Sequence, residues 1–347
     1  MKLEEILNKE NYSRDEIIYL LNLKNPEEMQ KLYKHADEVR KRYCGDEVHM
    51  RGIIEISNYC EQNCLYCGLR EDNISLERFR MSVEEIIETA NQITKLGIFT
   101  IVLQSGEDSE FDADFISHII FSIKQKSNAA ITLSLGERGF DEYRAWKIAG
   151  ADRYLLKHET SNKKLYSLYH SKQKLIDRIN HIKFLKRIGY QVGSGNMIGL
   201  PMQTIEDIAD DILLCKELDL DMAAFGPFIP SPNTPYHSKN AGSPELTLKV
   251  TAVLRLVLKN VHIPATTALD TLDQLGREKG LNVGANVIMP DLTPHPYRDN
   301  YQIYPGKRGV ADDPVESALK LQRRVEALGR KISFSRGDSM KIVLPAL

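Results

Sequence analysis

Three of the chain's five cysteines lie within eight residues, at Cys60, Cys64 and Cys67. Such close spacing favours a metal centre, and thiolates select zinc or iron-sulfur clusters. A closed site of either kind normally has four protein ligands. The other cysteines, Cys44 and Cys215, lie far away in the sequence and form no second close pair. The spacing therefore predicts a centre with three thiolate ligands and one open coordination position.

A [4Fe-4S] cluster held by three cysteines leaves one iron open to a small chelating ligand. The order Cys60-x-x-x-Cys64-x-x-Cys67, with the aromatic Tyr66 before the last cysteine, resembles the motif of radical S-adenosylmethionine (SAM) enzymes. The cysteines alone leave two other interpretations open. One is a set of reduced structural thiols, and the other is a zinc site completed by His49.

The bulk composition suits a globular protein that acts on a small molecule or another protein. Hydrophobic residues make up 42% of the 347 residues and charged residues 27%, which is enough for a sizeable core. The 46 Lys and Arg nearly balance the 48 Asp and Glu, so no overall charge favours nucleic acid. The sequence contains neither a signal-peptide pattern nor an apolar run that could span a membrane. We expect a cytoplasmic location.

Beyond the cysteines, the sequence alternates between strand and helix patterns. Residues 1–45 are predicted to form a cap of short amphipathic helices, with Ser13 and Asn25 as N-caps, that covers the lower end of a barrel. Ser82 with Glu85 predicts a capping box before a later helix. The predicted strands are residues 50–57, 99–105, 130–136, 152–159, 190–199, 222–229, 263–269 and 285–290.

Eight parallel strands with intervening helices predict a complete (βα)8 TIM barrel. We expect this α/β barrel over residues 46–300, after the N-terminal helical extension and before a C-terminal extension at 301–347. Several predicted strands end in Gly, Ser, Thr or His. In such barrels the carboxyl ends of the strands carry the chemistry, so these polar residues are expected to share one cavity mouth.

A SAM site needs a cation for the carboxylate, acceptors for the ammonium and hydroxyl groups, and an apolar slot for the adenine. Glu159, at the end of a predicted strand, offers two acceptor oxygens for the ribose. Arg178 can pair with the methionyl carboxylate, although a solvent-exposed helix arginine is the alternative. The glycines around Met197 allow close approach of the adenine to the backbone. The segment after the second strand, which resembles the Gly-Gly-Glu-like ammonium site of radical SAM enzymes or else forms a simple capping turn, comprises Gln104, Ser105, Gly106 and Glu107.

A wider set of segments resembles the HydE family of [FeFe]-hydrogenase maturases over about residues 35–310. These segments are QSGED, YLLKHET, MIGLP, FGPFIP, IPATTA, GANVIMP and PYRDNYQIYPGK. The resemblance implies a complete TIM barrel whose cavity holds one [4Fe-4S] cluster and SAM at its top. It further implies that a 5'-deoxyadenosyl radical made from SAM attacks a small iron-bound, cysteine-derived precursor during assembly of the hydrogenase's diiron subcluster. The precursor would come from a sister maturase.

The same resemblance assigns a substrate cavity to Thr266, Thr267, Tyr301 and Tyr304, and Arg51 is expected to add positive charge there. There are departures from the family pattern. Lys157 replaces an arginine, Met202 replaces a glycine, and residues 305–347 contain no cysteine for an accessory cluster. Two alternatives therefore stay open, a methylornithine-synthase-like radical SAM mutase and a non-catalytic iron-sulfur scaffold.

Overall fold

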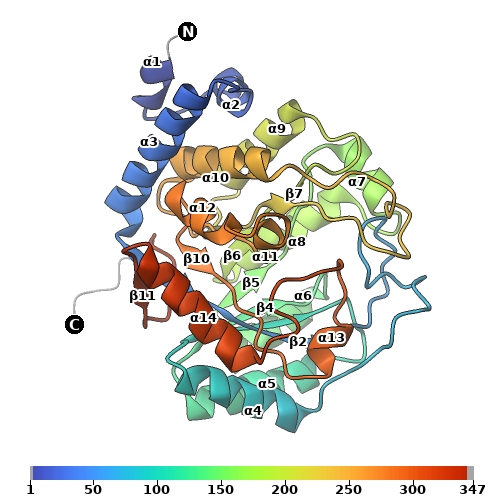
Figure 1. The fold of residues 1–347 in the computed structure, drawn as a ribbon. Helices are drawn as coiled ribbons and strands as arrows, with labels where there is room; N and C mark the ends of the chain where they lie inside the picture. Colours follow the sequence, from blue (N-terminus) through green and yellow to red (C-terminus); the bar gives the residue numbers. More distant parts are fainter. Residues whose placement is uncertain (1–2, 342–347) are drawn as a thin grey trace.

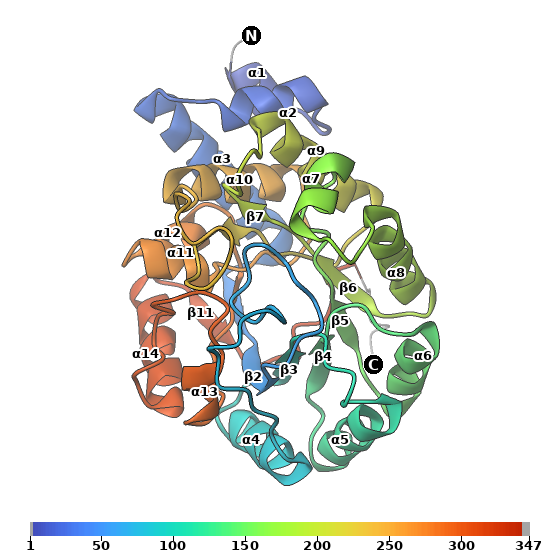
Figure 2. The same ribbon diagram turned by 90° about the vertical axis from the view of Figure 1, so that its right-hand side faces the viewer.

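The computed structural model describes residues 3–341, which form an α/β fold with helices around the outside of a parallel sheet (Figures 1 and 2). Within this part of the chain, no helix combines the length and hydropathy that a membrane crossing requires. The central sheet has six parallel strands in the order β2-β3-β4-β5-β6-β8. Their bounds are β2 (Gly52–Ser57), β3 (Thr100–Ser105), β4 (Ala130–Ser134), β5 (Arg153–Leu155), β6 (Gln191–Ser194) and β8 (Met222–Ala223).

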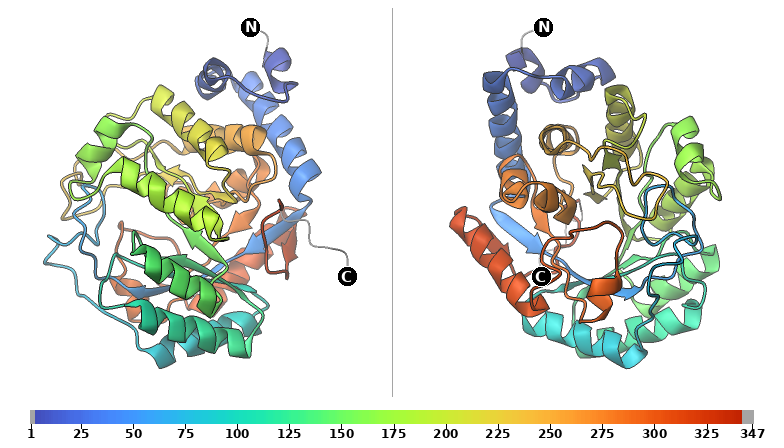
Figure 3. Two further views of the ribbon diagram at one scale, coloured as in Figure 1. Left: turned by 180° about the vertical axis from the view of Figure 1, so that it is seen from behind. Right: turned by 45° about the vertical axis from the view of Figure 1, so that its right-hand side comes forward.

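Two smaller parallel sheets accompany the central one. The first has the order β10-β1-β11, and the second pairs β7 with β9. Figure 3 shows from behind that β11 lies beside β1, although the two strands stand at opposite ends of the sequence. The bounds are β1 (Glu47–Met50), β7 (Met197–Ile198), β9 (Gly226–Pro227), β10 (Val287–Ile288) and β11 (Lys331–Ser333).

Helices alternate with the strands as the sequence predicts, and their N-caps follow local rules. Ser82 with Glu85 forms the predicted capping box, and Thr204 with Asp207 forms another. The helices are α4 (Val83–Lys95), α5 (Ala113–Lys126), α6 (Phe140–Ala149), α7 (Lys163–Tyr169), α8 (Leu175–Arg187), α9 (Ile205–Glu217), α10 (Pro244–Leu258), α11 (Thr267–Leu272), α12 (Gly276–Asn282), α13 (Tyr297–Asn300) and α14 (Pro314–Ala327).

Several predicted strands are shorter than expected or divided. The pattern at residues 190–199 forms β6 and β7, because Gly195 has a φ of 155° that interrupts the extended backbone. The strand predicted at 263–269 is wrong. Pro264 makes only an isolated parallel bridge to Val287, and Thr266 already caps α11. Further isolated parallel bridges join Met222 to His262 and Ile53 to Asp291, so the chain after β8 runs alongside both edges of the sheet.

The N-terminal helices do not cover the lower end of the sheet, contrary to the prediction. They are α1 (Leu3–Leu7), α2 (Arg14–Leu21) and α3 (Pro26–Cys44), capped by Ser13 and Asn25 as expected. They pack against α9 and α10 at the side of the molecule (Figure 2). The reason lies in α10, whose side chains are buried on every face from Thr247 to Leu258. Most faces of α10 are apolar, with Lys249 and Arg255 buried among them, so its outer side needs cover as well, and α2 and α3 provide it.

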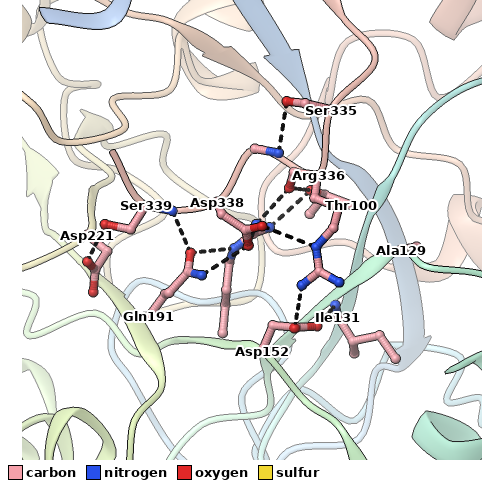
Figure 4. Close-up of polar contacts among 12 residues, drawn as sticks. Thr100, Ala129, Ile131, Asp152, Gln191, Asp221, Ser335, Arg336, Asp338 and Ser339 are labelled. Carbon is pink, nitrogen blue, oxygen red and sulfur yellow. Dashed lines mark hydrogen bonds and ion pairs between the residues drawn. The ribbon is translucent and has the colours of Figure 1, made fainter. Parts of the chain in front are cut away.

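The C-terminal segment covers the starts of the strands instead (Figure 4). Asp338 accepts hydrogen bonds from Arg153 Nη2 at 2.8 Å and Gln191 Nε2 at 3.0 Å, at the starts of β5 and β6. Ser339 Oγ donates to Asp221 at 2.6 Å, just before β8. Arg336 binds Asp152 at 2.6 Å. Residues 336–339 therefore tie the amino ends of three neighbouring strands together.

Candidate active site

The cysteines lie in a loop that leaves the carboxyl end of β2 (Gly52–Ser57) and returns at Arg80, which bridges Ser57. In Figure 2 this loop is drawn in blue and crosses the centre of the view. The guanidinium of Arg78 holds the loop in shape by donating to four backbone carbonyls. The acceptors are the carbonyl oxygens of Asn58, Leu69, Arg70 and Asn73. One side chain thus satisfies polar groups that no helix or sheet could pair in such a loop.

Backbone hydrogen bonds fix the cysteine loop to three distant segments. Glu61 N donates to Glu107 O at 3.0 Å, and Leu65 N donates to Tyr169 O at 3.1 Å. Gly68 N donates to the carbonyl of Ile303 at 3.0 Å. A Cβ at Gly68 would lie 2.0 Å from the carbonyl oxygen of Gln302, so only glycine permits this approach.

All three motif cysteines line one cavity of about 390 Å³. Cys60 Sγ accepts a hydrogen bond from Glu107 N at 3.4 Å, and Cys64 Sγ lies 3.3 Å from His170 Nδ1. Burial raises the pKa of the Cys64 thiol, and the neighbouring thiols Cys67 and Cys60 add to the effect. Cys60, Cys64 and Cys67 are all free thiols, so their three sulfur atoms are available to bind a ligand.

Glu107 contacts the cysteine loop through both its backbone and its side chain. Its oxygens accept from Gln62 Nε2 at 2.7 Å, from Gln173 Nε2 at 3.0 Å and from the backbone of Glu137 at 2.9 Å. Burial raises the pKa of Glu107, whereas Arg178 opposes that shift. Next to it, a Cβ on Gly106 would come within 2.2 Å of Tyr59 O, so the turn requires glycine. Gln104 and Ser105 also line the cavity, and the next helix, α5, is capped by Asp112 rather than by this segment.

Arg178 is only 6% exposed, which rules out the solvent-exposed alternative. Its guanidinium pairs with Glu137, and it donates to Lys157 O at 3.1 Å and to Gln173 Oε1 at 2.7 Å. A carboxylate oxygen of Glu107 lies 3.9 Å away. The arginine is therefore held rigidly at the cavity wall by groups of the chain itself.

Glu159 has the features of a hydrogen-bond acceptor that binds a ligand. Its φ of 62° lies in the left-handed region, which costs a non-glycine residue about 1–3 kcal/mol. Its backbone N donates to Gly195 O at 3.0 Å, which holds this conformation. The Oε2 atom is buried and has no hydrogen-bond partner in the described part of the chain. Because leaving a buried carboxylate unpaired is costly, these facts favour a ligand here. Met197 and Tyr66 line the same cavity and pack against one hydrophobic cluster.

The residues expected to contact substrate also line this cavity, with one exception. Thr266 and Thr267 sit at the start of α11 rather than on a strand, and both line the cavity. Tyr301 accepts a hydrogen bond from Gln104 Nε2 at 3.3 Å, and Tyr304 lies on the same wall. Arg51 is the exception.

Arg51 lines a separate small pocket with Arg153 and His262 at the amino ends of the strands. The residue precedes β2, so its side chain lies at the opposite end of that strand from the cysteine loop, with Nη1 2.8 Å from Met222 Sδ. The expected contribution of Arg51 to the cavity charge is therefore wrong.

The cavity lining also includes polar residues that sequence reasoning did not single out, among them Glu55, His170, Gln173 and Lys307. His170 and Gln173 come from the connection between α7 and α8, which carries no motif. Lys307 belongs to a segment that resembles the maturases, so that segment was the available clue. Glu55 sits inside a strand, where only the position of a charged residue in an apolar run could have indicated a role.

The donors at this cavity fit an iron-sulfur cluster with SAM better than a zinc ion. No three His, Cys, Asp or Glu side chains between Leu3 and Lys341 lie close enough to hold a single metal ion. A four-iron cluster holds its thiolates further apart, so the three cysteines suit that larger group. His49 stands against His262, with ring centroids 5.0 Å apart, and does not complete a zinc site with the loop. The unpartnered Glu159 oxygen and the glycine turn beside the cysteines would suit a SAM molecule bound next to such a cluster.

This combination of fold and cysteine loop defines a radical SAM protein, and residues 54–215 match the Radical SAM superfamily. Over 338 residues the chain is 48% identical to the [FeFe] hydrogenase maturase subunit HydE of Thermotoga maritima, with 97% of each chain covered. The chain belongs to the HydE family of [FeFe] hydrogenase maturases.

More distant relatives share the fold. The 3-methylornithine synthase of Methanosarcina acetivorans is 29% identical over 94% of this chain and 92% of its own length. The crystal structure of methylornithine synthase superposes with a TM-score of 0.84 at 26% identity, covering 95% of this chain and 97% of the other. The hydrogenase maturase HydG of Carboxydothermus hydrogenoformans gives 0.82 at 22% identity, covering 96% and 79%.

Proposed function

We propose that this protein is a radical SAM maturase of the HydE type that acts in assembly of the diiron subcluster of [FeFe]-hydrogenase. The observation that carries the proposal is the 48% identity to HydE over 97% of the chain. The substrate would be a small iron-bound, cysteine-derived precursor, which a 5'-deoxyadenosyl radical attacks. The other hydrogenase maturases are the proposed partners, without nucleic acid or membrane, and the proposed location is the cytoplasm.

Cys60, Cys64 and Cys67 would hold one [4Fe-4S] cluster, which when bound supplies the electron that cleaves SAM to methionine and the 5'-deoxyadenosyl radical. Cys44 and Cys215 are poor candidates for a second cluster. Cys44 Sγ faces Lys259 O at 3.7 Å, and Cys215 is fully buried on α9. These two cysteines lie on different helices and away from the motif, which supports the proposal of a single cluster.

The chain's own residues would bind and orient SAM. Glu107 and the backbone at Gly106 would receive the ammonium group, Glu159 the ribose hydroxyls and Arg178 the carboxylate. Tyr66 and Met197 would contribute the apolar surface beside the adenine. Gln104 and Ser105 would line the SAM site at the strand end. Because these groups line the same cavity as the cysteines, SAM would lie between the cluster and the substrate end.

The substrate end would be formed by Thr266, Thr267, Tyr301 and Tyr304, whose hydroxyls suit a compact polar guest. We further propose that the sheet completes a (βα)8 barrel. The isolated parallel bridges at Met222–His262, Pro264–Val287 and Ile53–Asp291 support this closure.

Reductive cleavage of SAM tests the proposal. The anaerobically reconstituted and reduced protein is expected to form methionine and 5'-deoxyadenosine and to bind about four iron atoms per chain. Replacing all three motif cysteines with alanine should abolish both, while circular dichroism shows a folded protein. No 5'-deoxyadenosine in the presence of substrate would favour the iron-sulfur scaffold. Formation of 3-methylornithine from lysine would favour the mutase that shares this fold.

A further inference from the structure

A buried cluster of charged residues stands at the wall of the cavity and has no part in the SAM site. Glu55 on β2 and Lys307 both line the cavity, and the Lys307 ammonium pairs with Glu55 and with Asp291 at 2.6 Å. Glu55 is 1% exposed and Asp291 8% exposed. One lysine thus lies between two buried carboxyl groups.

The two carboxyl groups are not equivalent. Asp291 accepts from Lys307 Nζ and from Thr293 N at 3.1 Å, and Arg298 Nε lies 3.5 Å away. Glu55 has the lysine on Oε1, but its Oε2 has no partner among residues 3–341. A buried carboxylate is stabilised by the donors around it, so Asp291 is the better site for the negative charge.

Proton sharing follows from this asymmetry. Burial raises the pKa of Glu55 well above its usual value, and the charge of Asp291 adds to the shift while Lys307 opposes it. Burial also works against ionisation of Asp291, but Lys307 and Arg298 outweigh it and lower that pKa. The phenols on this wall, Tyr301 and Tyr304, also have raised pKa values because of burial and remain neutral donors.

We propose that Glu55 is a proton-carrying binding residue whose carboxylic acid donates a hydrogen bond to an anionic oxygen of the substrate. Glu55 lines the cavity, and its buried Oε2, which has no partner among the described residues, is the atom that would carry this proton. A carboxyl group held neutral in an apolar site acts as a donor rather than an acceptor. The neighbouring Lys307 makes the same wall attractive to a carboxylate and unattractive to an ammonium group. The ligand class is a small carboxylate-bearing molecule.

The identity of that molecule rests on the proposed function, whereas the proton on Glu55 does not. Infrared difference spectroscopy tests the proton directly on protein without cluster or SAM. The spectrum of the wild type minus that of Glu55→Gln is expected to show the C=O band of a protonated carboxylic acid at neutral pH. Asp211, whose pKa burial raises to about 7, is a second source of such a band, so Asp211→Asn serves as the matched control. A carboxylate band in place of the acid band would overturn the proposal.

The stability of two variants gives a second test, because an ion pair between Lys307 and an ionised Glu55 would give a different result. Glu55→Gln replaces one neutral group by another, so the midpoint of urea unfolding at neutral pH should stay close to that of the wild type. Asp291→Asn removes the negative charge that faces Lys307 and Arg298 and should lower the midpoint clearly. Equal losses in the two variants would mean that Glu55 is ionised and would overturn the proposal.

Substrate binding gives the third readout. With the iron-cysteine product of the sister maturase as substrate, Glu55→Ala should raise KM about tenfold, with a smaller effect on kcat, because one hydrogen bond to a charged group is lost. Glu55→Gln, whose amide still donates, should keep a KM closer to that of the wild type. An unchanged KM in Glu55→Ala would overturn the binding role of Glu55. Failure of the wild type to cleave SAM would instead count against the proposed function and leave the infrared result standing.

Discussion

The phenol oxygen of Tyr66 lies 3.1 Å from Nε2 of His170, whose Nδ1 lies 3.3 Å from the sulfur of Cys64. Burial lowers the pKa of His170 to about 3, and the charge of Arg178 acts in the same direction, so the ring is neutral. A neutral imidazole has one donor and one acceptor nitrogen. Once Cys64 binds the cluster as a thiolate it can only accept, so Nδ1 would carry the proton toward Cys64 and Nε2 would accept from Tyr66.

This arrangement predicts that His170→Phe lowers the reduction potential of the reconstituted cluster. A hydrogen bond to a ligating sulfur stabilises the more negative, reduced state. Loss of about 1.4 kcal/mol corresponds to about 59 mV for a one-electron couple. Redox titration followed by electron paramagnetic resonance measures the shift. Tyr66→Phe, which leaves the Nδ1 donor in place, should shift the potential less, and identical potentials for wild type and His170→Phe would contradict the arrangement.

The hydrogen bonds from Arg78 to four carbonyls of the cysteine loop predict that even a substitution that preserves its charge has a large effect on stability. Arg78→Lys keeps the cation but cannot reach four carbonyls at once, so the loop loses hydrogen bonds worth about 1–3 kcal/mol of unfolding free energy. Urea unfolding measures the loss, and hydrogen exchange should locate it in residues 58–78. Arg144→Lys is the matched control, because Arg144 lies at the surface, where it pairs with the exposed Asp141 and stacks over Phe184, and a lysine keeps the charge there. Equal stabilities for the two variants would show that the loop does not depend on Arg78.

Glu159→Gln should weaken SAM binding with little effect on stability. Burial raises the pKa of Glu159 while the charges of Lys157 and Arg178 oppose that shift, and the substitution keeps the shape but removes a carboxyl oxygen that lacks a partner within the described residues. Hydrogen bonds from ribose hydroxyls to a charged acceptor are worth about 1.5–3 kcal/mol, so at least a tenfold rise in the Kd for SAM is expected. Calorimetric titration of the reconstituted protein gives this value. Arg178→Ala is a poorer test, because it strands the buried Glu137 that the arginine pairs with.

The C-terminal segment predicts a pH-dependent contribution to stability. Burial works against ionisation of Asp338, but its bond to Gln191 and the charges of Arg153 and Arg336 lower its pKa below 3.8. A group with a lowered folded pKa stabilises the protein above its unfolded pKa, and this contribution is lost as the pH falls through the folded value. Asp338→Asn should therefore cost about 2 kcal/mol at neutral pH.

In acid, the difference between Asp338→Asn and the wild type should shrink as the pH falls below about 4. Thermal unfolding at a series of pH values measures this difference. Asp141→Asn, at a residue whose side chain is 96% exposed, is the control and should have almost no effect at any pH. A constant difference between Asp338→Asn and wild type across the series would rule out the ionic role of Asp338.

Local features of this fold could be predicted from the sequence, whereas its long-range closures could not. The caps at Ser82 and Thr204 depend on residues three positions apart, so their patterns are visible in the sequence. The role of residues 336–339 depends on contacts with strands that begin more than a hundred residues earlier. For the same reason the N-terminal helices were predicted in the wrong place. The largely apolar sequence of α10 indicates that other segments cover this helix, but it does not indicate which ones.

The candidate site divides in the same way. The cysteines and the carboxylate Glu159 stand at strand ends, where the topology of a parallel sheet brings polar residues together. Arg51 stands at the beginning of a strand, and that one difference in position moved it to another pocket. His170 and Lys307 reach the cavity from connections without regular structure, which no periodicity describes.

Restoration of hydrogenase activity tests the central claim most directly. Apo-[FeFe]-hydrogenase would be incubated anaerobically with the other maturases, SAM, reductant, the iron-cysteine product of the sister maturase and the reconstituted protein. A HydE-type maturase is expected to restore hydrogen evolution, and the variant lacking Cys60, Cys64 and Cys67 is expected to restore none. Hydrogen evolution no higher with the wild type than with that variant, although the wild type cleaves SAM, would contradict the assignment to hydrogenase maturation.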